Sequence, residues 1–260
     1  GENDRAVDLF TQALNLKPNF AEAYSNQGLA LQELGRLEDA VVSYNKAVTI
    51  KPDYAEAFNN LGLVFQELRN LDEALDSYHK ALAIKPNYAK AYYNLGNAKF
   101  ELGNLEEAVA SYRKAIDNRP DYAEAHYNLG NMLLQLGKLN GAEKSYPLAL
   151  ESRADYLEAI TSYGILLIAL DRWTEALEKF NRKLKLVRGN NPVDPNLASF
   201  RFITKAKLKH DIEQFRYMER LSLGPKGLSK LVQLYEALDK EIEWPDGDSI
   251  AVPLTGSQLD

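Results

Sequence analysis

Hydrophobic and polar positions follow a helical period along most of the chain, and the pattern itself repeats. Apolar residues recur three or four positions apart in stretches separated by short polar segments, as amphipathic helices require. Glycines and aromatic residues then return at intervals of 34 residues. The glycines are Gly28, Gly62, Gly96, Gly130 and Gly164, and the aromatic residues are Phe10, Tyr44, Tyr78, Tyr112, Tyr146 and Phe180. A fixed period of this length is typical of repeat proteins.

Each repeat predicts a pair of helices. In the third repeat we expect the first helix over residues 88–102 and the second over 105–116, with Gly103 and Asn104 as the stop between them and Pro120 as the end of the second helix. A short polar residue followed three positions later by a glutamate predicts a capping box at the start of a first helix. The predicted boxes are Asn19 with Glu22, Asp53 with Glu56, Asp121 with Glu124 and Asp155 with Glu158.

The glycine series predicts close contact between the two helices of a repeat. A glycine inside a helix costs up to ~1 kcal/mol relative to alanine. Because that cost recurs at the same place in five repeats, we expect a steric reason for it. Gly96 would let the helices approach, and Tyr112 would fill the space beside the contact.

The glycine and aromatic series, together with an alanine series and a proline series, resemble the tetratricopeptide repeat (TPR) family. The alanines are Ala6, Ala40, Ala74, Ala108, Ala142 and Ala176, and the prolines are Pro18, Pro52, Pro86 and Pro120. The resemblance covers about residues 1–190. It implies an all-α, right-handed superhelical solenoid of helix-turn-helix repeats, with a concave, protein-binding groove lined by the first helices.

The resemblance, together with the pattern of apolar residues after residue 190, divides the chain into four regions. We expect residues 1–20 to hold only the second helix of a partial repeat, and residues 21–190 to hold five repeats, the last degenerate. The five repeats start at residues 21, 55, 89, 123 and 157. Residues 191–245 predict a helical hairpin that caps the solenoid, and residues 246–260 a tail.

Two features depart from the regular repeat. The helix at the N-terminus lacks a first-helix partner, so its apolar residues, which include Phe10 and Leu14, predict self-association through that end. Pro147 lies inside a predicted second helix, where it removes one backbone hydrogen bond, so we expect a kink there.

The cysteine content, apolar runs and charge of the chain argue against several classes of protein. The absence of cysteine excludes a disulfide scaffold, thiolate-bound zinc and thiol catalysis, and it favours a cytoplasmic location. No apolar run is long enough to span a membrane. Basic residues gather in residues 172–232, but the net charge of the whole chain is -6 and no aromatic residues interleave with the basic ones, which makes nucleic acid an unfavoured partner.

No catalytic, metal or cofactor site is predicted. His126 takes the place of Tyr92 and Phe58 in the repeat, so we interpret it as a packed core residue. His79 is expected at the surface, and neither it nor His210 is paired with a nucleophile or a second metal ligand. The chain also lacks a phosphate-binding loop.

Asparagines at the 34-residue spacing predict a binding surface. The series is Asn26, Asn60, Asn94 and Asn128. Each lies two residues before the repeat glycine, about 200° away around the helix, so we expect it to face the groove. Since an amide both donates and accepts hydrogen bonds, the series predicts pairing with the backbone of an extended peptide. Asn97, Asn131, Tyr93 and Tyr127 extend the predicted site. The alternative is that the amides bond neighbouring helices and tie the repeats together.

The asparagine series is similar to that of O-GlcNAc transferase repeat arrays, which implies recognition of peptide backbone. The segment 208–218 loosely resembles a segment of bacterial proteins that join a TPR array to a 2-oxoglutarate/iron oxygenase module. We therefore predict a non-catalytic scaffold that binds an extended peptide. The alternative is the substrate-recognition arm of a larger enzyme, a glycosyltransferase or an oxygenase, with its catalytic domain outside this chain.

The predicted ligand is not a free C-terminal carboxylate. Relatives that bind such a carboxylate use basic residues where this chain has Ser25, Asn59, Tyr93 and Tyr127. Glutamates dominate the predicted groove, and Lys90 is the one basic residue expected on its wall. An extended segment with some basic character fits this surface better.

Overall fold

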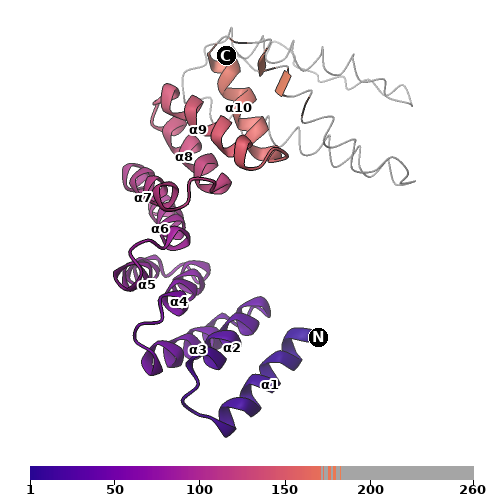
Figure 1. Cartoon of the computed structure of the whole chain (residues 1–260), viewed down its shortest axis with the longest axis vertical. Coiled ribbons are helices and arrows are strands. Elements are labelled where there is room, and N and C mark those ends of the chain that lie inside the picture. The colour runs from indigo at the N-terminus through magenta and orange to yellow at the C-terminus, as the bar shows by residue number, and fades with distance from the viewer. Residues whose placement is uncertain (171, 173–174, 177, 180–181, 183–260) are drawn as a thin grey trace, which may run out of the picture. The chain divides into compact units, whose positions relative to one another are not determined.

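The computed structural model describes residues 1–170, 172, 175–176, 178–179 and 182, and the helices α1 to α10 lie within them (Figure 1). Their bounds are α1 Glu2–Leu16, α2 Ala21–Glu33, α3 Leu37–Ile50, α4 Ala55–Glu67, α5 Leu71–Ile84, α6 Ala89–Glu101, α7 Leu105–Asn118, α8 Ala123–Gln135, α9 Leu139–Ser152 and α10 Leu157–Ala169. The described part of the chain contains no strand.

The chain divides into two compact units, Gly1–Ala159 and Ile160–Asp260. In the first unit each helix from α1 to α8 packs against the next one, up to α9. The first helices α2, α4 and α6 also contact one another in succession, so they form a layer of their own beside the second helices. The predicted fold class, an all-α solenoid, is confirmed.

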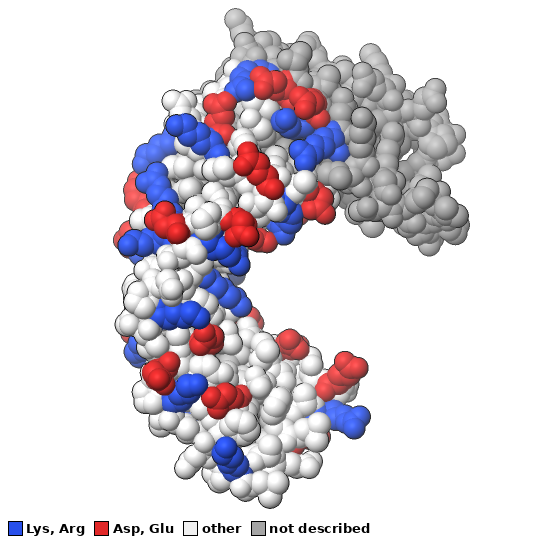
Figure 2. Space-filling model, in the orientation of Figure 1, with Lys and Arg blue, Asp and Glu red and all other residues white. Residues whose placement is uncertain are grey.

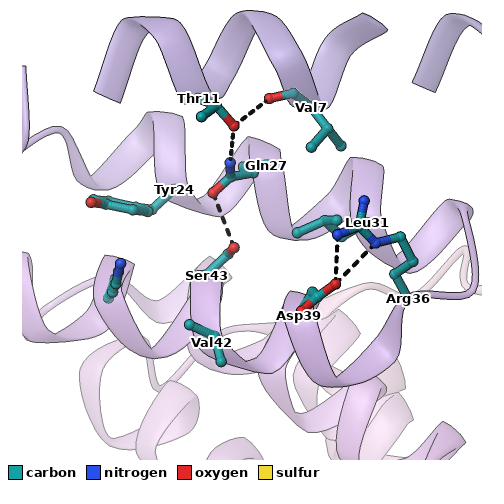
Figure 3. A pocket seen from close by; sticks show the side chains of 10 residues that line it. Val7, Thr11, Tyr24, Gln27, Leu31, Arg36, Asp39, Val42 and Ser43 are labelled. Carbon is teal, nitrogen blue, oxygen red and sulfur yellow. Dashed lines mark hydrogen bonds and ion pairs between the residues drawn. The ribbon is translucent and has the colours of Figure 1, made fainter. Parts of the chain in front are cut away.

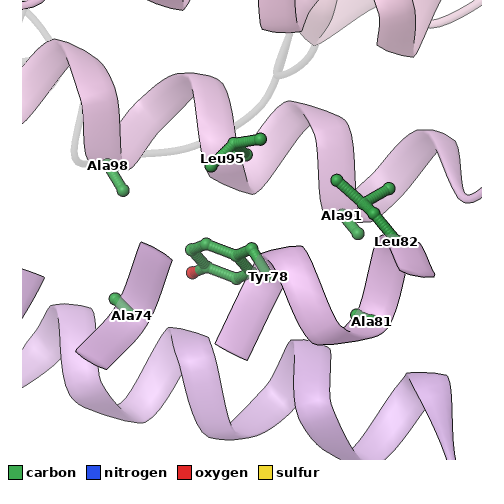
Figure 4. Close-up of a cluster of buried hydrophobic side chains, with 7 residues drawn as sticks. All are labelled: Ala74, Tyr78, Ala81, Leu82, Ala91, Leu95 and Ala98. Atoms are coloured by element: carbon green, nitrogen blue, oxygen red, sulfur yellow. The ribbon is translucent and has the colours of Figure 1, made fainter. Parts of the chain in front are cut away.

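A glycine and a tyrosine interlock the two helices of each repeat. The ring of Tyr78 is fully buried among alanines and leucines of α5 and α6 (Figure 4). A Cβ atom added at Gly62 would lie 2.6 Å from this ring, which is closer than real Cβ atoms approach. The same construction gives 2.9 Å for Gly28 and Tyr44, and 2.7 Å both for Gly96 and Tyr112 and for Gly130 and Tyr146. The predicted steric reason is therefore confirmed for these four glycines, whereas the aromatic residue predicted beside Gly164, Phe180, lies outside the described residues.

The turn between the two helices of a repeat needs a residue in the left-handed region. Gly35, Gly103 and Gly137 have φ angles of 71°, 79° and 68° there, as a glycine after a helix end commonly does. The second repeat places Arg69 at the same point with a φ of 64°. An L-residue is strained in this conformation, so this turn is held at a cost that the other three avoid.

The predicted capping boxes are wrong for the first helices α2, α4 and α8. Their N-cap residues are Phe20, Tyr54 and Tyr122, and no side chain caps them. The aromatic residue occupies the cap, so the polar residue before it lies one position too early to bond the first turn. The glutamates pair instead with cations at the ends of second helices, as described below.

Two other predictions concern single helices. The helix α9 continues from Leu139 to Ser152 without a break at Pro147, although proline removes one backbone donor there. In α1, Leu14 is buried and Phe10 is half-buried, so the two residues on which the prediction of self-association rested are largely covered within the chain. Leu9 is 55% exposed and Leu16 is 89% exposed, so other apolar surface is accessible on this helix. Self-association through α1 stays a prediction.

In the second unit, Leu167, Ile168 and Ala176 form a buried cluster against Tyr163. The predicted hairpin at 191–245, the tail at 246–260 and most of the basic segment lie outside the described residues. Within the described residues, no helix is both long enough and apolar enough to cross a membrane.

Candidate functional site

All eight predicted site residues lie on the first helices α2, α6 and α8 or on α4 between them. We call the side of these four helices that carries the asparagine series the first-helix face. The four asparagines differ in exposure along it. Asn26 is exposed, Asn60 and Asn128 are half-buried, and Asn94 is only 4% exposed.

Asn94 links two repeats rather than facing solvent. Its Nδ2 donates a hydrogen bond of 2.9 Å to Oδ1 of the buried Asn59 on α4. Asn59 in turn donates to Oδ1 of Asn60 at 3.3 Å. The expectation that every amide in the series faces an open groove is therefore wrong for Asn94, because its amide bonds the side chain of Asn59 in the preceding repeat.

Asn128 makes the corresponding link from α8 to α6. Its Nδ2 lies 3.2 Å from the hydroxyl of Tyr93 and 3.1 Å from Oδ1 of Asn97. Unlike Asn94, it remains half-buried. Within the described residues, Oδ1 of Asn128 accepts no hydrogen bond and Nδ2 of Asn97 donates none. An unused acceptor on Asn128 and an unused donor on Asn97 therefore lie on neighbouring side chains.

The core holds Asn97 and Asn131 in one orientation. The hydroxyl of Tyr112 donates to Oδ1 of Asn97 at 2.8 Å, and that of Tyr146 donates to Oδ1 of Asn131 at 2.9 Å. Burial raises the pKa of both tyrosines, so the hydroxyls stay protonated near neutral pH. With each amide oxygen fixed in this way, the Nδ2 donors are fixed as well.

Tyr93 and Tyr127 are half-buried and locked by other rings. The centroid of Tyr93 lies 4.9 Å from that of Tyr122 and 5.9 Å from that of Tyr112. Tyr127 has the same two neighbours one repeat later, Tyr156 at 5.0 Å and Tyr146 at 6.3 Å. Burial raises the pKa of Tyr122 to about 12. These contacts give the third and fourth repeats a rigid aromatic surface that the first two repeats lack.

A second set of inter-repeat bonds joins the C-terminal ends of the first helices. Gln32 donates to Glu67 at 2.5 Å, and Gln66 donates to Glu101. The third repeat has Phe100 in place of these glutamines, and its side chain is 40% exposed. This end of the first-helix face therefore changes from polar to apolar along the array.

A repeating cation was missed in the sequence reasoning. A lysine or arginine ends each of the second helices α1, α3, α5, α7 and α9, and it lies over the ring three residues later. The pairs are Lys17 and Phe20 at 4.6 Å, Lys51 and Tyr54 at 4.6 Å, Lys85 and Tyr88 at 4.7 Å, Arg119 and Tyr122 at 3.1 Å, and Arg153 and Tyr156 at 3.5 Å. The 34-residue spacing of cation and ring was the signal that could have found them.

Three of these cations also hold a glutamate of the first-helix face. The ion pairs are Glu22 with Lys51 at 3.1 Å, Glu56 with Lys85 at 2.9 Å and Glu124 with Arg153 at 2.9 Å. Its own backbone N–H, together with Lys51, holds the pKa of Glu22 below its usual range. A hydrogen bond from Lys85 does the same for the pKa of Glu56. Acidic and basic side chains are accordingly interspersed on the face seen in Figure 2.

One cavity lies apart from the predicted site, among α1, α2 and α3 (Figure 3). It has a volume of about 230 Å³. Gln27 crosses it, donating to Oγ1 of Thr11 at 2.9 Å and accepting from Oγ of Ser43 at 3.1 Å. None of the eight predicted residues lines it.

Two histidines, His79 and His126, lie in the described part of the chain. His126 is 5% exposed, and its Nε2 lies 2.8 Å from the carbonyl oxygen of Pro120, so its interpretation as a packed residue is confirmed. His79 is exposed, as predicted. Among the described residues, no three histidine, cysteine or acidic side chains gather as metal ligands would.

Taken together, helix pairs at a 34-residue period with a polar and aromatic first-helix face define an α-helical repeat protein. Family models described as "TPR repeat" match residues 1–35, 28–68, 70–103 and 96–137, and one described as "Tetratricopeptide repeat" matches residues 123–163. The chain belongs to the tetratricopeptide repeat family.

Solved structures show the same fold. MamA is 24% identical, covers 63% of this chain and 95% of its own, and has a TM-score of 0.58. YrrB, described as a TPR protein with an unusual peptide-binding site, is 24% identical, covers 68% and 91%, and has a TM-score of 0.56. MamA from Desulfovibrio magneticus RS-1 is 19% identical, covers 66% and 97%, and has a TM-score of 0.59. No curated protein matches the chain.

Proposed function

We propose that this chain is a protein-interaction module that holds an extended peptide against the first-helix face. The observation that carries the proposal is the pair of amides on α6 and α8. Nδ2 of Asn97 and Oδ1 of Asn128 are both without a partner inside the described residues, although the two side chains are bonded to each other. The description of YrrB as a peptide-binding TPR protein supports the same use of this fold.

The two free groups are complementary to a peptide backbone. An extended peptide presents a carbonyl oxygen, which Asn97 would bond, and an N–H group, which would donate to Asn128. Such bonds do not depend on the peptide's sequence. Because Tyr112 already fixes Asn97, little side-chain freedom is lost when the peptide binds.

The remaining predicted residues divide into two roles. Asn131 repeats the tyrosine-held geometry of Asn97 and would bond the next stretch of peptide. Tyr93 and Tyr127 would offer ring surface to apolar side chains of the ligand. Asn26 and Asn60 stay in the proposed site as accessible amides, whereas Asn94 acts as a tie between repeats.

The test uses a substitution that removes donors and keeps the acceptor. Asn97→Asp and Asn131→Asp each retain the oxygen that the core tyrosine needs, but neither can donate to a ligand. Asn45→Asp makes the same change on the exposed side of α3 and is the matched control. Peptides would first be selected from a phage-displayed random 12-residue library on the unaltered chain, and their affinities would then be measured by titration.

We expect each of the two variants to bind the selected peptides about two- to tenfold more weakly, since a lost hydrogen bond costs ~0.5–1.5 kcal/mol. The melting temperatures should stay close to that of the unaltered chain. Equal affinity for all four proteins would remove Asn97 and Asn131 from the site. Failure to enrich any peptide would contradict the proposed function itself.

A further inference from the structure

The third repeat replaces an ion pair of the first-helix face with two cations. The second residue of α2, α4 and α8 is a glutamate, and each glutamate pairs with the cation that ends the next helix. In α6 the corresponding residue is Lys90, and the cation that ends α7 is Arg119. Neither Lys90 nor Arg119 forms an ion pair with an acid of the described part of the chain.

The fourth repeat shows what such an arginine can hold. Arg153 lies over the ring of Tyr156 at 3.5 Å, and at the same time its Nη1 holds Oε1 of Glu124 at 2.9 Å. Arg119 lies over Tyr122 at 3.1 Å in the same register. Stacking on a ring therefore leaves the guanidinium able to hold a carboxylate. In the third repeat the described part of the chain supplies no carboxylate to Arg119, and Lys90 adds a second positive charge.

We propose that Lys90 and Arg119 bind an acidic side chain, aspartate or glutamate, of the peptide held on the first-helix face. This inference rests on the proposed function, because the carboxylate must be brought by that ligand. Lys90 lies one helical turn before Tyr93 and Asn94 on α6, so the carboxylate site is continuous with the amide pair. The N-terminal end of α6 also favours negative charge through its unpaired backbone N–H groups.

Charged residues on the first-helix face also favour a particular distribution of charge along the ligand. The exposed Glu33 and Glu67, at the C-terminal ends of α2 and α4, favour positive charge on the parts of a peptide near them. Lys90 and Arg119 favour negative charge at the start of α6. The preferred ligand is therefore an extended peptide with one internal acid among neutral or basic residues.

The experiment compares peptide selections on two proteins. A random 12-residue library would be displayed as N-terminal fusions on phage, so that no peptide has a free C-terminus. Selection would run in parallel on the unaltered chain and on Lys90→Glu, which gives the third repeat the ion pair of the other three. We expect aspartate or glutamate to be enriched at one position by the unaltered chain and not by Lys90→Glu.

Titration would then assign the effect to the carboxylate. A selected peptide with an amidated C-terminus would be compared with its acid-to-amide version. At low ionic strength, Lys90→Glu should weaken the acidic peptide about threefold or more and leave the amide version unchanged, and added salt should reduce the difference. Lys114→Glu on the exposed side of α7 makes the same charge change and is the control.

The outcomes separate the carboxylate site from the peptide-binding module. Peptides that are enriched equally in acids by both proteins would overturn the carboxylate site and leave the peptide-binding module standing. No enrichment by either protein would overturn both. If Lys90→Glu does not fold, as judged by circular dichroism, Lys90→Gln replaces it with the same expected loss of acid selection.

Discussion

The first two repeats and the third and fourth repeats share one frame but carry different faces. In both halves a glycine of the first helix lies against a buried tyrosine ring, with distances of 2.6–2.9 Å to an added Cβ. On the first-helix face, however, Ser25 and Asn59 give way to Tyr93 and Tyr127. The contact of glycine and tyrosine is the same in all four repeats, whereas these positions on the face differ between them. The variation along the face is therefore where function is to be sought.

The face also affects the core, because it supplies the partner of the buried tyrosine hydroxyl. In the third and fourth repeats that partner is Asn97 or Asn131, and in the second repeat Gln66 accepts from Tyr78 at 2.9 Å. In the first repeat the hydroxyl of Tyr44 is buried and finds no partner at hydrogen-bond geometry among the residues that the structure describes. Burial raises the pKa of Tyr44, and the nearby amide of Asn60 opposes that rise only in part.

The largest effect is expected from breaking the shared frame. Gly62→Ala and Gly96→Ala should each lower the free energy of unfolding by about 1–3 kcal/mol, because the new methyl group overlaps the tyrosine ring. Helix propensity alone would raise stability by up to ~1 kcal/mol, so the sign of the change separates the two causes. Urea denaturation would measure both variants. A gain in stability in either half would show that the halves do not share the frame.

The second effect separates a tie from an open amide. Asn94→Ala should cost about 1–3 kcal/mol, since it leaves the buried Asn59 without its partner. Asn26→Ala removes an exposed amide and should be neutral or gain up to ~0.7 kcal/mol from helix propensity. Thermal melts of the two variants make the comparison. Equal melting temperatures would mean that the Asn94 bond contributes nothing between the repeats.

The third effect concerns the turn of the second repeat, which has Arg69 where the turns of the first, third and fourth repeats have a glycine. Arg69→Ala removes the ion pair of 2.8 Å with Glu101 but keeps the left-handed backbone strain. Arg69→Gly removes both. The glycine variant should therefore be more stable than the alanine variant by about 1 kcal/mol. If the two variants unfold at the same urea concentration, the turn of the second repeat is not strained.

The shared frame could be predicted from the sequence because the same glycine–tyrosine contact recurs in each of the first four repeats. Gly62 and Tyr78 recur at a fixed spacing, and their contact needs only local geometry. The burial and hydrogen bond of Asn94 could not be predicted. Its partner Asn59 lies in another repeat, so the contact depends on how neighbouring repeats stack. The capping boxes failed for a similar reason. Lys51 ends the second helix of the same repeat, and it takes the glutamate that the motif assigns to the cap.

A fourth prediction makes the first repeat resemble the third. Leu29 holds the position that Asn97 and Asn131 hold in the later repeats, and it is 46% exposed. Leu29→Asn should give the hydroxyl of Tyr44 the acceptor it lacks and raise the free energy of unfolding by about 0.5–1.5 kcal/mol. Leu29→Ala, which brings no acceptor, is the control. An asparagine variant no more stable than the alanine variant would show that the partner of Tyr44 is set elsewhere.

The smallest effect distinguishes the ion-paired repeats from the third one by pH. The hydrogen bond from Lys85 lowers the folded-state pKa of Glu56 from its ordinary value of 4.5. The unfolded chain therefore binds this proton more readily, so the stabilisation is full above that value and is lost as the pH falls through the lower, folded-state pKa. Glu56→Gln should cost at most about 1 kcal/mol at pH 7, because the pair is exposed, and should flatten the fall in stability on the acid side. Lys90→Gln, which removes no acid pair, should leave that acid-side slope unchanged. Melting curves from about pH 3 to pH 7 would measure the dependence of stability on pH. If both variants flattened that dependence equally, the expected difference between the repeats would be wrong.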